Sequence, residues 1–261
     1  MLVDSHCHLD YFLRDGDLND ALQRAREAEV GCMVTIGTRI STFDTVLSIA
    51  ENHSDIFCTV GVHPNEAGDE GLSSPDVLIE RSQHPRVVGL GESGLDYHYD
   101  HAPREKQAVS FRAHIEAARE TGLPLVVHTR DADEDTVAIM REEYEKGEYP
   151  AVIHCFTAGR DLAMASLEMG FYISLSGVLT FKSGQPIRDI VRDVPMDRLL
   201  VETDSPYLAP IPFRGKRNEP SYVQHTARVL AEVKSVSEEE ISRQTTENFF
   251  RLFSKASTGT V

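Results

Sequence analysis

The sequence predicts an α/β fold in which residues 1–261 form one domain, a single (β/α)8 TIM barrel. Two patterns and the chain length support this prediction. Short apolar runs rich in β-branched residues recur along the chain, segments with helical spacing lie between them, and 261 residues match the roughly 250 of such barrels. Barrel enzymes build their active sites from the loops that follow the strands, so we expect functional residues at the carboxyl ends of strands.

Eight strands are predicted, at residues 2–7, 32–37, 57–62, 87–92, 123–128, 151–155, 171–176 and 198–203. Their runs are almost continuously apolar, as expected for parallel strands that are covered on both faces. A doubly wound open sheet is the alternative fold. It is disfavoured because no glycine-rich phosphate loop of the GxGxxG type follows the first strand.

Apolar residues at helical spacing predict the helices between and after these strands. The longest is expected over residues 104–121, where Gly122 is placed to end it. Others are expected over residues 18–25, 41–50, 162–169, 221–233 and 238–253. Ser41 is the expected cap of the second of these shorter helices, because a serine hydroxyl can accept a hydrogen bond from the first turn.

The composition is that of a soluble globular protein, with 41% hydrophobic and 26% charged residues. No apolar run reaches the roughly 20 residues of a membrane span, and the first residues lack the basic start of a secretory signal. We therefore expect a cytoplasmic monomer with no membrane partner. The four cysteines, Cys7, Cys32, Cys58 and Cys155, lack CxxC spacing and are expected as buried thiols in strands.

The charge balance is strongly acidic. There are 26 Lys and Arg residues and 42 Asp and Glu residues, which gives a formal net charge of -16. This balance weighs against a broad electrostatic surface for nucleic acid. It does not exclude a substrate that is held locally by metal ions and a few arginines.

Two histidines at the end of the first predicted strand indicate a metal site. His6 and His8 are separated by one residue, and side chains at i and i+2 of a strand project to the same side. Further metal-compatible side chains follow four other predicted strands. The candidate ligands are His6, His8, Glu92, His128, His154 and Asp204.

Six ligands fit two adjacent divalent cations better than one, because a tetrahedral site is complete with four ligands. Glu92 is the carboxylate near the middle of the series, and we expect its two oxygens to bridge the ions. His6, His8 and Asp204 would hold one cation. His128 and His154 would hold the other. The four histidines favour zinc or another transition metal by ligand softness.

The expected chemistry is hydrolysis. Two adjacent divalent cations acidify a bound water enough for it to attack a phosphorus or carbonyl centre at neutral pH. Asp204 is the expected group that orients this water and takes its proton. Glu92 and Asp204 are therefore the predicted catalytic residues.

The motifs that carry these residues resemble those of the TatD-type metal-dependent deoxyribonucleases, a family of the amidohydrolase-like barrel superfamily. The matching segments are residues 4–10, 61–64, 91–97, 128–132, 154–157, 202–210 and 214–220. The resemblance implies a TIM barrel, dependence on divalent metal ions, and phosphodiester hydrolysis, often as a 3′ to 5′ exonuclease on DNA. It also implies that the six candidate ligands occupy the metal positions of the family. Nucleases of this family typically use magnesium, so the resemblance leaves Mg, Mn and Zn as the expected cations.

Residues beside the six ligands are expected to bind the substrate. His63 follows the third strand and should contact the scissile phosphate or a water. Arg130 should face the same cavity as His128 and clamp a phosphate; the alternative is a salt bridge from Arg130 to Asp131 or Glu202. The basic loop 214–217 and Asn218 follow the last strand, where barrels often bind phosphate, so Arg217 and Asn218 are candidate phosphate contacts. Glu202 should point inward, where it would orient a ligand histidine or help hold a cation.

These observations predict a metal-dependent DNase that acts on single-stranded DNA or on duplex ends. One alternative is a hydrolase of another bond on the same metal centre, such as a D-aminoacyl-tRNA deacylase, in which case tRNA is the partner. An arginine that clamps phosphate suits both substrates and does not separate them. A further alternative is a metal-stabilised barrel that acts as a scaffold without catalysis.

Overall fold

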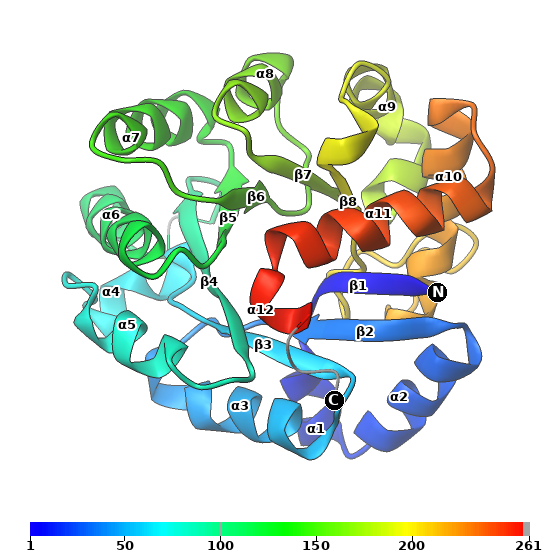
Figure 1. Ribbon diagram of the computed structural model, residues 1–261, viewed down its shortest axis with the longest axis horizontal. Coiled ribbons are helices and arrows are strands. Elements are labelled where there is room, and N and C mark those ends of the chain that lie inside the picture. Colours follow the sequence, from blue (N-terminus) through cyan, green and yellow to red (C-terminus); the bar gives the residue numbers. More distant parts are fainter. Residues whose placement is uncertain (100, 258–261) are drawn as a thin grey trace.

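The protein is described by a computed structural model over residues 1–99 and 101–257 (Figure 1). Within these residues, eight strands form one sheet in the order β1 to β8, and every sequential pair is parallel. The strands are β1 (Leu2–Cys7), β2 (Val30–Thr35), β3 (Ile56–Val60), β4 (Val87–Asp96), β5 (Leu125–Arg130), β6 (Ala151–Ile153), β7 (Tyr172–Leu175) and β8 (Leu199–Val201). The predicted barrel of eight parallel strands is confirmed.

The chain segments that follow the last strand lie against the first strand and close the barrel. Cys7 forms a parallel bridge with Ser205. The N–H of Asp204 donates to the carbonyl of His6 at 2.9 Å, and the N–H of His8 donates to the carbonyl of Ser205 at 2.8 Å. This closure brings together two segments that lie near opposite ends of the sequence and that carry predicted ligands.

Helices surround the strands (Figure 1). Those that connect strands are α1 (Leu9–Asp15), α2 (Leu18–Glu27), α3 (Phe43–Asn52), α4 (Ala67–Glu70), α5 (Asp76–Ser82), α6 (Arg104–Thr121), α7 (Asp133–Glu145), α8 (Arg160–Glu168) and α9 (Gln185–Val191). Those that follow β8 are α10 (Val223–Lys234), α11 (Glu238–Leu252) and α12 (Ser254–Ser257). Helix α6 has the predicted bounds, and it ends at Gly122, whose φ of 69° is left-handed.

The prediction that Ser41 caps a helix is wrong. Ser41 lies in a short 3-10 turn that precedes α3, and Thr42 occupies the capping position without a side-chain hydrogen bond. The hydroxyl of Ser41 instead donates to Glu70 at the end of α4. A long-range partner therefore replaces the local one, which the spacing of residues does not reveal.

Several helices were not expected from apolar spacing, and α7 shows the reason. Its buried face includes Thr136 and Glu143 beside its apolar residues, so the hydrophobic repeat is interrupted. Glu143 is tolerated there because it accepts hydrogen bonds from Arg112 at 2.6 Å and from Arg119 at 3.0 Å. Partners on the neighbouring helix α6 make this polar face compatible with burial.

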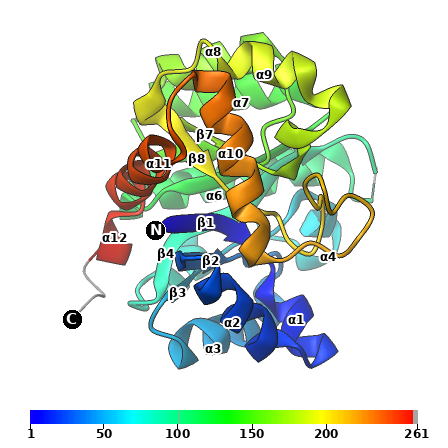
Figure 2. The ribbon, with the colours of Figure 1, turned by 90° about the vertical axis from the view of Figure 1, so that its right-hand side faces the viewer.

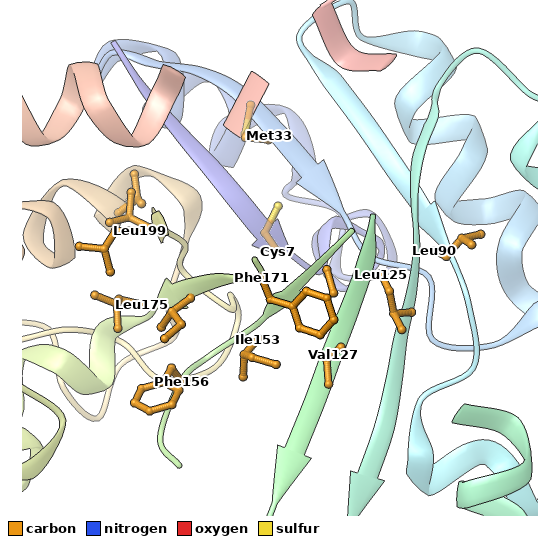
Figure 3. Close-up of a cluster of buried hydrophobic side chains, with 14 of the residues drawn as sticks. Cys7, Met33, Leu90, Leu125, Val127, Ile153, Phe156, Phe171, Leu175 and Leu199 are labelled. Atoms are coloured by element: carbon orange, nitrogen blue, oxygen red, sulfur yellow. The ribbon is translucent and has the colours of Figure 1, made fainter. Parts of the chain in front are cut away.

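The apolar core has two layers. The outer layer packs the strands against the helices, and Figure 3 shows part of it, including Leu90, Val127 and Phe171. The inner layer fills the barrel with residues such as Val88 and Val126. Phe249 of α11 and Phe253, which lies between α11 and α12, join this layer. Figure 2 places α11 and α12 beside the amino terminus of β1. They close that end of the barrel and leave the opposite end for a site.

The cysteine prediction is largely confirmed. Cys7, Cys32 and Cys58 are buried in β1, β2 and β3, and all four thiols are free. Cys155 is the exception, since it is only partly buried and lies in the turn that follows β6. Among the described helices, none combines the length and the apolar character that a membrane span requires.

Candidate metal centre

The six predicted ligands meet at the carboxyl ends of the strands. His6 lies in β1 and His8 directly after it, Glu92 lies in β4, His128 in β5, His154 directly after β6, and Asp204 three residues after β8. Five of them are buried, and His128 is partly buried. Parallel strands in one barrel end on the same side, which explains why residues so far apart in the sequence converge.

The first group of side chains faces one oxygen of Glu92. The Nε2 atoms of His6 and His8 lie 3.4 and 3.9 Å from Oε2 of Glu92. The same nitrogens lie 3.6 and 3.4 Å from Oδ1 of Asp204. Two imidazoles and two carboxylates thus surround one point on the β1 and β8 side of the barrel.

The second group faces the other oxygen of Glu92. Nδ1 of His128 and Nε2 of His154 both lie 2.8 Å from Oε1. Nε2 of His63 lies 3.5 Å from the same atom. Glu92 therefore stands between the two groups, with one carboxylate oxygen toward each.

The electrostatics of the centre favour a cation. Burial alone raises the pKa of Glu92, but attraction to His154 and hydrogen bonds with His128 and His154 hold this pKa well below its usual value. Asp204 behaves similarly: burial opposes ionisation, and its contact with His8 lowers the pKa below the usual value. Both carboxyls are therefore ionised in a buried cluster, where negative charge requires a positive partner.

The pKa of His63 shifts in the opposite sense from that of His154. Burial lowers the pKa of His63 to about 3, although Glu92 partly opposes this shift. Burial also disfavours the charged form of His154, but attraction to Glu92 and a contact with Glu202 raise its pKa well above the usual value. His63 is consequently a neutral imidazole, which is the form that binds a metal ion or accepts a hydrogen bond.

The residues present fit a divalent cation. His6 is 1% exposed, yet neither of its ring nitrogens has a hydrogen-bond partner. Such an unpartnered buried group is costly unless a ligand completes it. Three sets of donors lie close enough to hold an ion: His6, His8 and Glu92; His63, Glu92 and His128; and His6, His154 and Glu202. Imidazole nitrogens with carboxylate oxygens form the donor set of zinc and of other transition metals.

A cavity of about 530 Å³ opens above this centre. Its wall includes the ligands His8, Glu92, His128, His154 and Asp204, together with His63. Its outer part is lined by Tyr11, Tyr99, Arg130 and Tyr207. A substrate that enters this cavity reaches the metal-binding side chains directly.

Comparison with known proteins agrees with this geometry. The family model described as TatD related DNase matches residues 3–254. The chain belongs to this family. The Bacillus subtilis protein named uncharacterized metal-dependent hydrolase YabD is 42% identical over 253 residues, which cover 97% of this chain and 99% of that protein. The 3′-5′ ssDNA/RNA exonuclease TatD of Erwinia tasmaniensis is 34% identical over 244 residues, which cover 91% and 93%.

Solved structures of the TatD family share the fold. The crystal structure of YJJV, a TatD homologue from Escherichia coli, superposes with a TM-score of 0.87 at 28% identity and covers 97% of this chain and 98% of its own. The TatD family and the buried donor groups together identify this protein as a metal-dependent hydrolase.

Two acidic residues support the ligands of this TatD-family centre. Glu202, which was expected to orient a histidine, lies with Oε1 at 3.3 Å from Nδ1 of His154 and accepts the N–H of Cys155 at 2.7 Å. Asp96 lies with Oδ2 at 3.4 Å from Nε2 of His128. The other carboxylate oxygen of Asp96 accepts the N–H groups of His98 and Tyr99. Asp96 lies four residues after Glu92, at the end of the same strand. This position in the sequence could have predicted its contact with His128.

Arg130 lines the cavity of this TatD-family protein, as expected. Its guanidinium lies 4.7 Å from the centre of the Tyr99 ring. Among the described residues, Arg130 forms no ion pair with Asp131 or Glu202. Its charge is therefore available to a substrate.

The basic loop is arranged differently from the expectation. Arg217 does not line the cavity; it pairs with Asp15 at 3.2 Å and Asp17 at 2.9 Å, and its guanidinium lies over Phe12. In this arrangement the guanidinium of Arg217 faces two carboxylates beside α1. Its expected contact with a phosphate stays a prediction.

Asn218 also has a different place from the expected one. It is fully buried, and its amide nitrogen donates to the carbonyls of Thr203 at 2.8 Å and Tyr207 at 2.6 Å. Its amide oxygen accepts the N–H of Glu219. Because these bonds occupy the amide, Asn218 holds the segment that carries Asp204 and Tyr207 instead of facing a phosphate.

Proposed function

We propose that this protein is a DNase that hydrolyses phosphodiester bonds from the 3′ end, using two divalent cations of Mg, Mn or Zn. The observation that carries the proposal is the position of Glu92, whose Oε2 faces His6 and His8 and whose Oε1 faces His128 and His154. A carboxylate with one oxygen toward each of two histidine pairs is suited to bridge two ions.

In this proposal each cation would have its own ligands besides Glu92. His6, His8 and Asp204 would hold one, and His128 and His154 would hold the other. Divalent ions in such a site acidify a bound water and polarise the phosphoryl oxygen. His63 and Arg130 lie in the same cavity and bind the scissile phosphate, the first by a hydrogen bond and the second by charge.

Asp204 is the proposed proton acceptor. Its side chain is 13% exposed, compared with 3% for Glu92, so water reaches Asp204 more easily. Its lowered pKa keeps the carboxylate ionised at neutral pH. As the water oxygen bonds to phosphorus, Asp204 takes the proton that the water loses. The bond to the ester oxygen then breaks, and that oxygen leaves as an alcohol by taking this proton from Asp204.

The nature of the substrate is supported by a relative. The Erwinia tasmaniensis protein at 34% identity is named a 3′-5′ ssDNA/RNA exonuclease. A phosphodiester substrate also agrees with the cavity, in which Arg130 is available to a phosphate.

The proposal is tested by metal replacement and by two substitutions. Purified protein is stripped of metal, refilled with Mg, Mn or Zn in turn, and given single-stranded and duplex DNA labelled at the 5′ end. We expect successive shortening from the 3′ end that requires metal. His154→Ala and Asp204→Asn should keep the fold and lose at least about 100-fold in kcat. His53→Ala is the matched control, since His53 lies outside the cavity.

Two results would overturn the proposal. The first is release of no nucleotides with any of the three metals. The second is equal activity of Asp204→Asn and the unchanged protein, which would remove Asp204 as proton acceptor. If the protein hydrolyses a D-aminoacyl-tRNA and leaves DNA intact, the same metal centre catalyses the hydrolysis of an aminoacyl ester instead.

A further inference from the structure

Exposed aromatic side chains are concentrated at the mouth of the metal cavity. Among the described residues, the large apolar side chains that are exposed are Met1, Leu13, Tyr99, Val109, Tyr207, Ile211 and Val236. The two aromatic ones, Tyr99 at 50% and Tyr207 at 47%, both line this cavity. Exposing a large ring is unfavourable, and two such rings at one cavity indicate a ligand with aromatic faces.

The two rings belong to opposite sides of the barrel. Tyr99 follows β4 and Tyr207 follows β8. Because the sheet runs in order from β1 to β8 and closes through Cys7 and Ser205, β4 and β8 are four strands apart in either direction. Glu92 and the histidines of the metal centre lie between these two sides. A nucleic-acid strand that contacts both tyrosine rings therefore passes over the metal centre.

Each ring is held in place by neighbours on its own side. The guanidinium of Arg130 lies over the Tyr99 ring, 4.7 Å from its centre, and the rings of His98 and His101 lie 4.9 and 5.5 Å from it. The ring of Tyr207 forms T-shaped contacts with Tyr11 and His8, with centroids 5.8 and 5.9 Å apart. Its carbonyl accepts a hydrogen bond from the amide of the buried Asn218. These contacts fix the rings without a parallel stack: in the described part of the chain, neither Tyr99 nor Tyr207 has an aromatic ring stacked face to face on it.

The charge of the protein requires a source of affinity other than phosphate contacts. The net charge is -16, and Arg130 is the one Lys or Arg side chain among the described residues that line the cavity. Stacking of bases on aromatic rings does not depend on charge and accepts every base. In a duplex the base faces are already stacked, so this mode of binding favours single strands.

We propose that Tyr99 and Tyr207 are base-stacking platforms that hold the two nucleotides flanking the scissile phosphate, and that they select single-stranded ends. This inference rests on the proposed phosphodiester hydrolysis and adds the residues that recognise the strand. One base stacks on each side of the mouth, and the phosphate between them lies over Glu92 within reach of Arg130.

The test pairs variants with substrates that lack bases. Tyr207→Leu and Tyr99→Leu are compared with the unchanged protein on a single-stranded oligodeoxynucleotide and on the same strand with abasic sites at its two 3′-terminal positions. We expect each leucine variant to raise KM about ten-fold on the strand with bases and to leave KM on the abasic strand unchanged. Tyr207→Phe, which keeps the ring, should restore the preference for bases. Ile211→Ala is the control in the same segment, because Ile211 is exposed but does not line the cavity.

A second measurement does not depend on activity. Metal-free full-length protein is titrated into a single strand that carries 2-aminopurine at its 3′ end, a base whose fluorescence falls when it stacks. Fluorescence should fall with the unchanged protein and with Tyr207→Phe, and much less with Tyr207→Leu. Two results would overturn the role of Tyr99 and Tyr207 while DNA hydrolysis stands. In the first, the leucine variants bind and cleave the strand with bases and the abasic strand like the unchanged protein. In the second, they lose activity equally on both strands. If the unchanged protein cleaves no DNA, both proposals fall.

Discussion

Glu92 shows how a single residue can organise a site. It is 2% exposed, and it lies within 4 Å of ring nitrogens from His6, His8, His63, His128 and His154. Its ionised state depends on these neighbours, since burial alone favours the neutral acid. A buried carboxylate among five imidazoles is unfavourable for stability alone, which is typical of residues retained for function.

His114 offers a contrast, because it is a buried histidine with a structural role. It is fully buried in α6, where its Nε2 accepts the N–H of Val62 at 3.0 Å and its Nδ1 lies 2.7 Å from the carbonyl of Ser110. The ring is therefore neutral, with its proton on Nδ1. Burial lowers the pKa of His114 to about 4, although the Ser110 carbonyl opposes this shift.

This lowered pKa predicts a pH dependence of stability. Between pH 6.5 and 4 the unfolded chain binds a proton at His114 and the folded chain does not, so the free energy of unfolding falls as the pH falls. The free energy of unfolding is therefore higher above pH 6.5 than below pH 4, by on the order of 3 kcal/mol from His114 alone. Urea unfolding of the unchanged protein and His114→Gln at pH 7 and pH 4.5 checks this. The difference in the free energy of unfolding between the two proteins should be smaller at pH 4.5 than at pH 7. An equal difference at both pH values would contradict the predicted role of His114.

At the scale of elements, the centre depends on how closely β4 approaches its neighbours. Gly94 has a φ of +150°, and a Cβ at this position would lie 1.9 Å from the carbonyl oxygen of His128. Gly61 and Gly91 face each other across β3 and β4 in the same way, since a Cβ on Gly61 would lie 2.4 Å from Cα of Gly91. Glycines in these strand ends therefore let the strands that carry Glu92 and His128 lie close together.

Gly94→Ala should consequently damage both stability and activity. We expect a loss of at least about 2 kcal/mol and a strong loss of hydrolysis, because β5 must move away and carry His128 with it. Gly122→Ala is the matched control. Gly122 also has a positive φ, but a Cβ at this position would meet no atom within 4 Å, so strain of about 1 kcal/mol is expected with activity kept. Thermal unfolding and nucleotide release measured on both variants separate the two outcomes.

At the scale of the whole molecule, the two ends of the barrel have different tasks. The segment of α11 and α12 closes one end with apolar side chains such as Phe249 and Phe253, and the charged and aromatic residues of the cavity lie at the other. The formal net charge of -16 opposes the approach of nucleic acid. Binding of a strand must therefore be local.

Local binding predicts a weak dependence on salt. With Arg130 as the one contributing Lys or Arg of the cavity, the slope of log affinity against log salt for a single strand should be about −0.7. The affinity should then fall only about three-fold between 50 and 200 mM salt. Fluorescence titration of a single-stranded oligonucleotide over this range measures the slope. A slope steeper than about −3 would show that further cations, such as those of loop 214–217, contact the backbone.

The sequence by itself determined the barrel and the six residues at its strand ends. The repeat of apolar runs and helices is a local pattern, and parallel strands in one closed sheet all end on the same side. Once the barrel was predicted, His6, His8, Glu92, His128, His154 and Asp204 had to face one region. Their convergence follows from the fold class and needs no knowledge of loop conformation.

Only the tertiary structure decided the surroundings of that region. Arg217 pairs with Asp15 and Asp17. The buried Asn218 donates to the carbonyl of Tyr207, and Oδ2 of Asp96 lies 3.4 Å from Nε2 of His128. The contact of Arg217 with Asp17 spans 200 positions of the chain, beyond the reach of any local pattern. The physical reason is that loop side chains choose among many partners, and their choice depends on packing across the barrel, whereas strands follow the periodicity of their own residues.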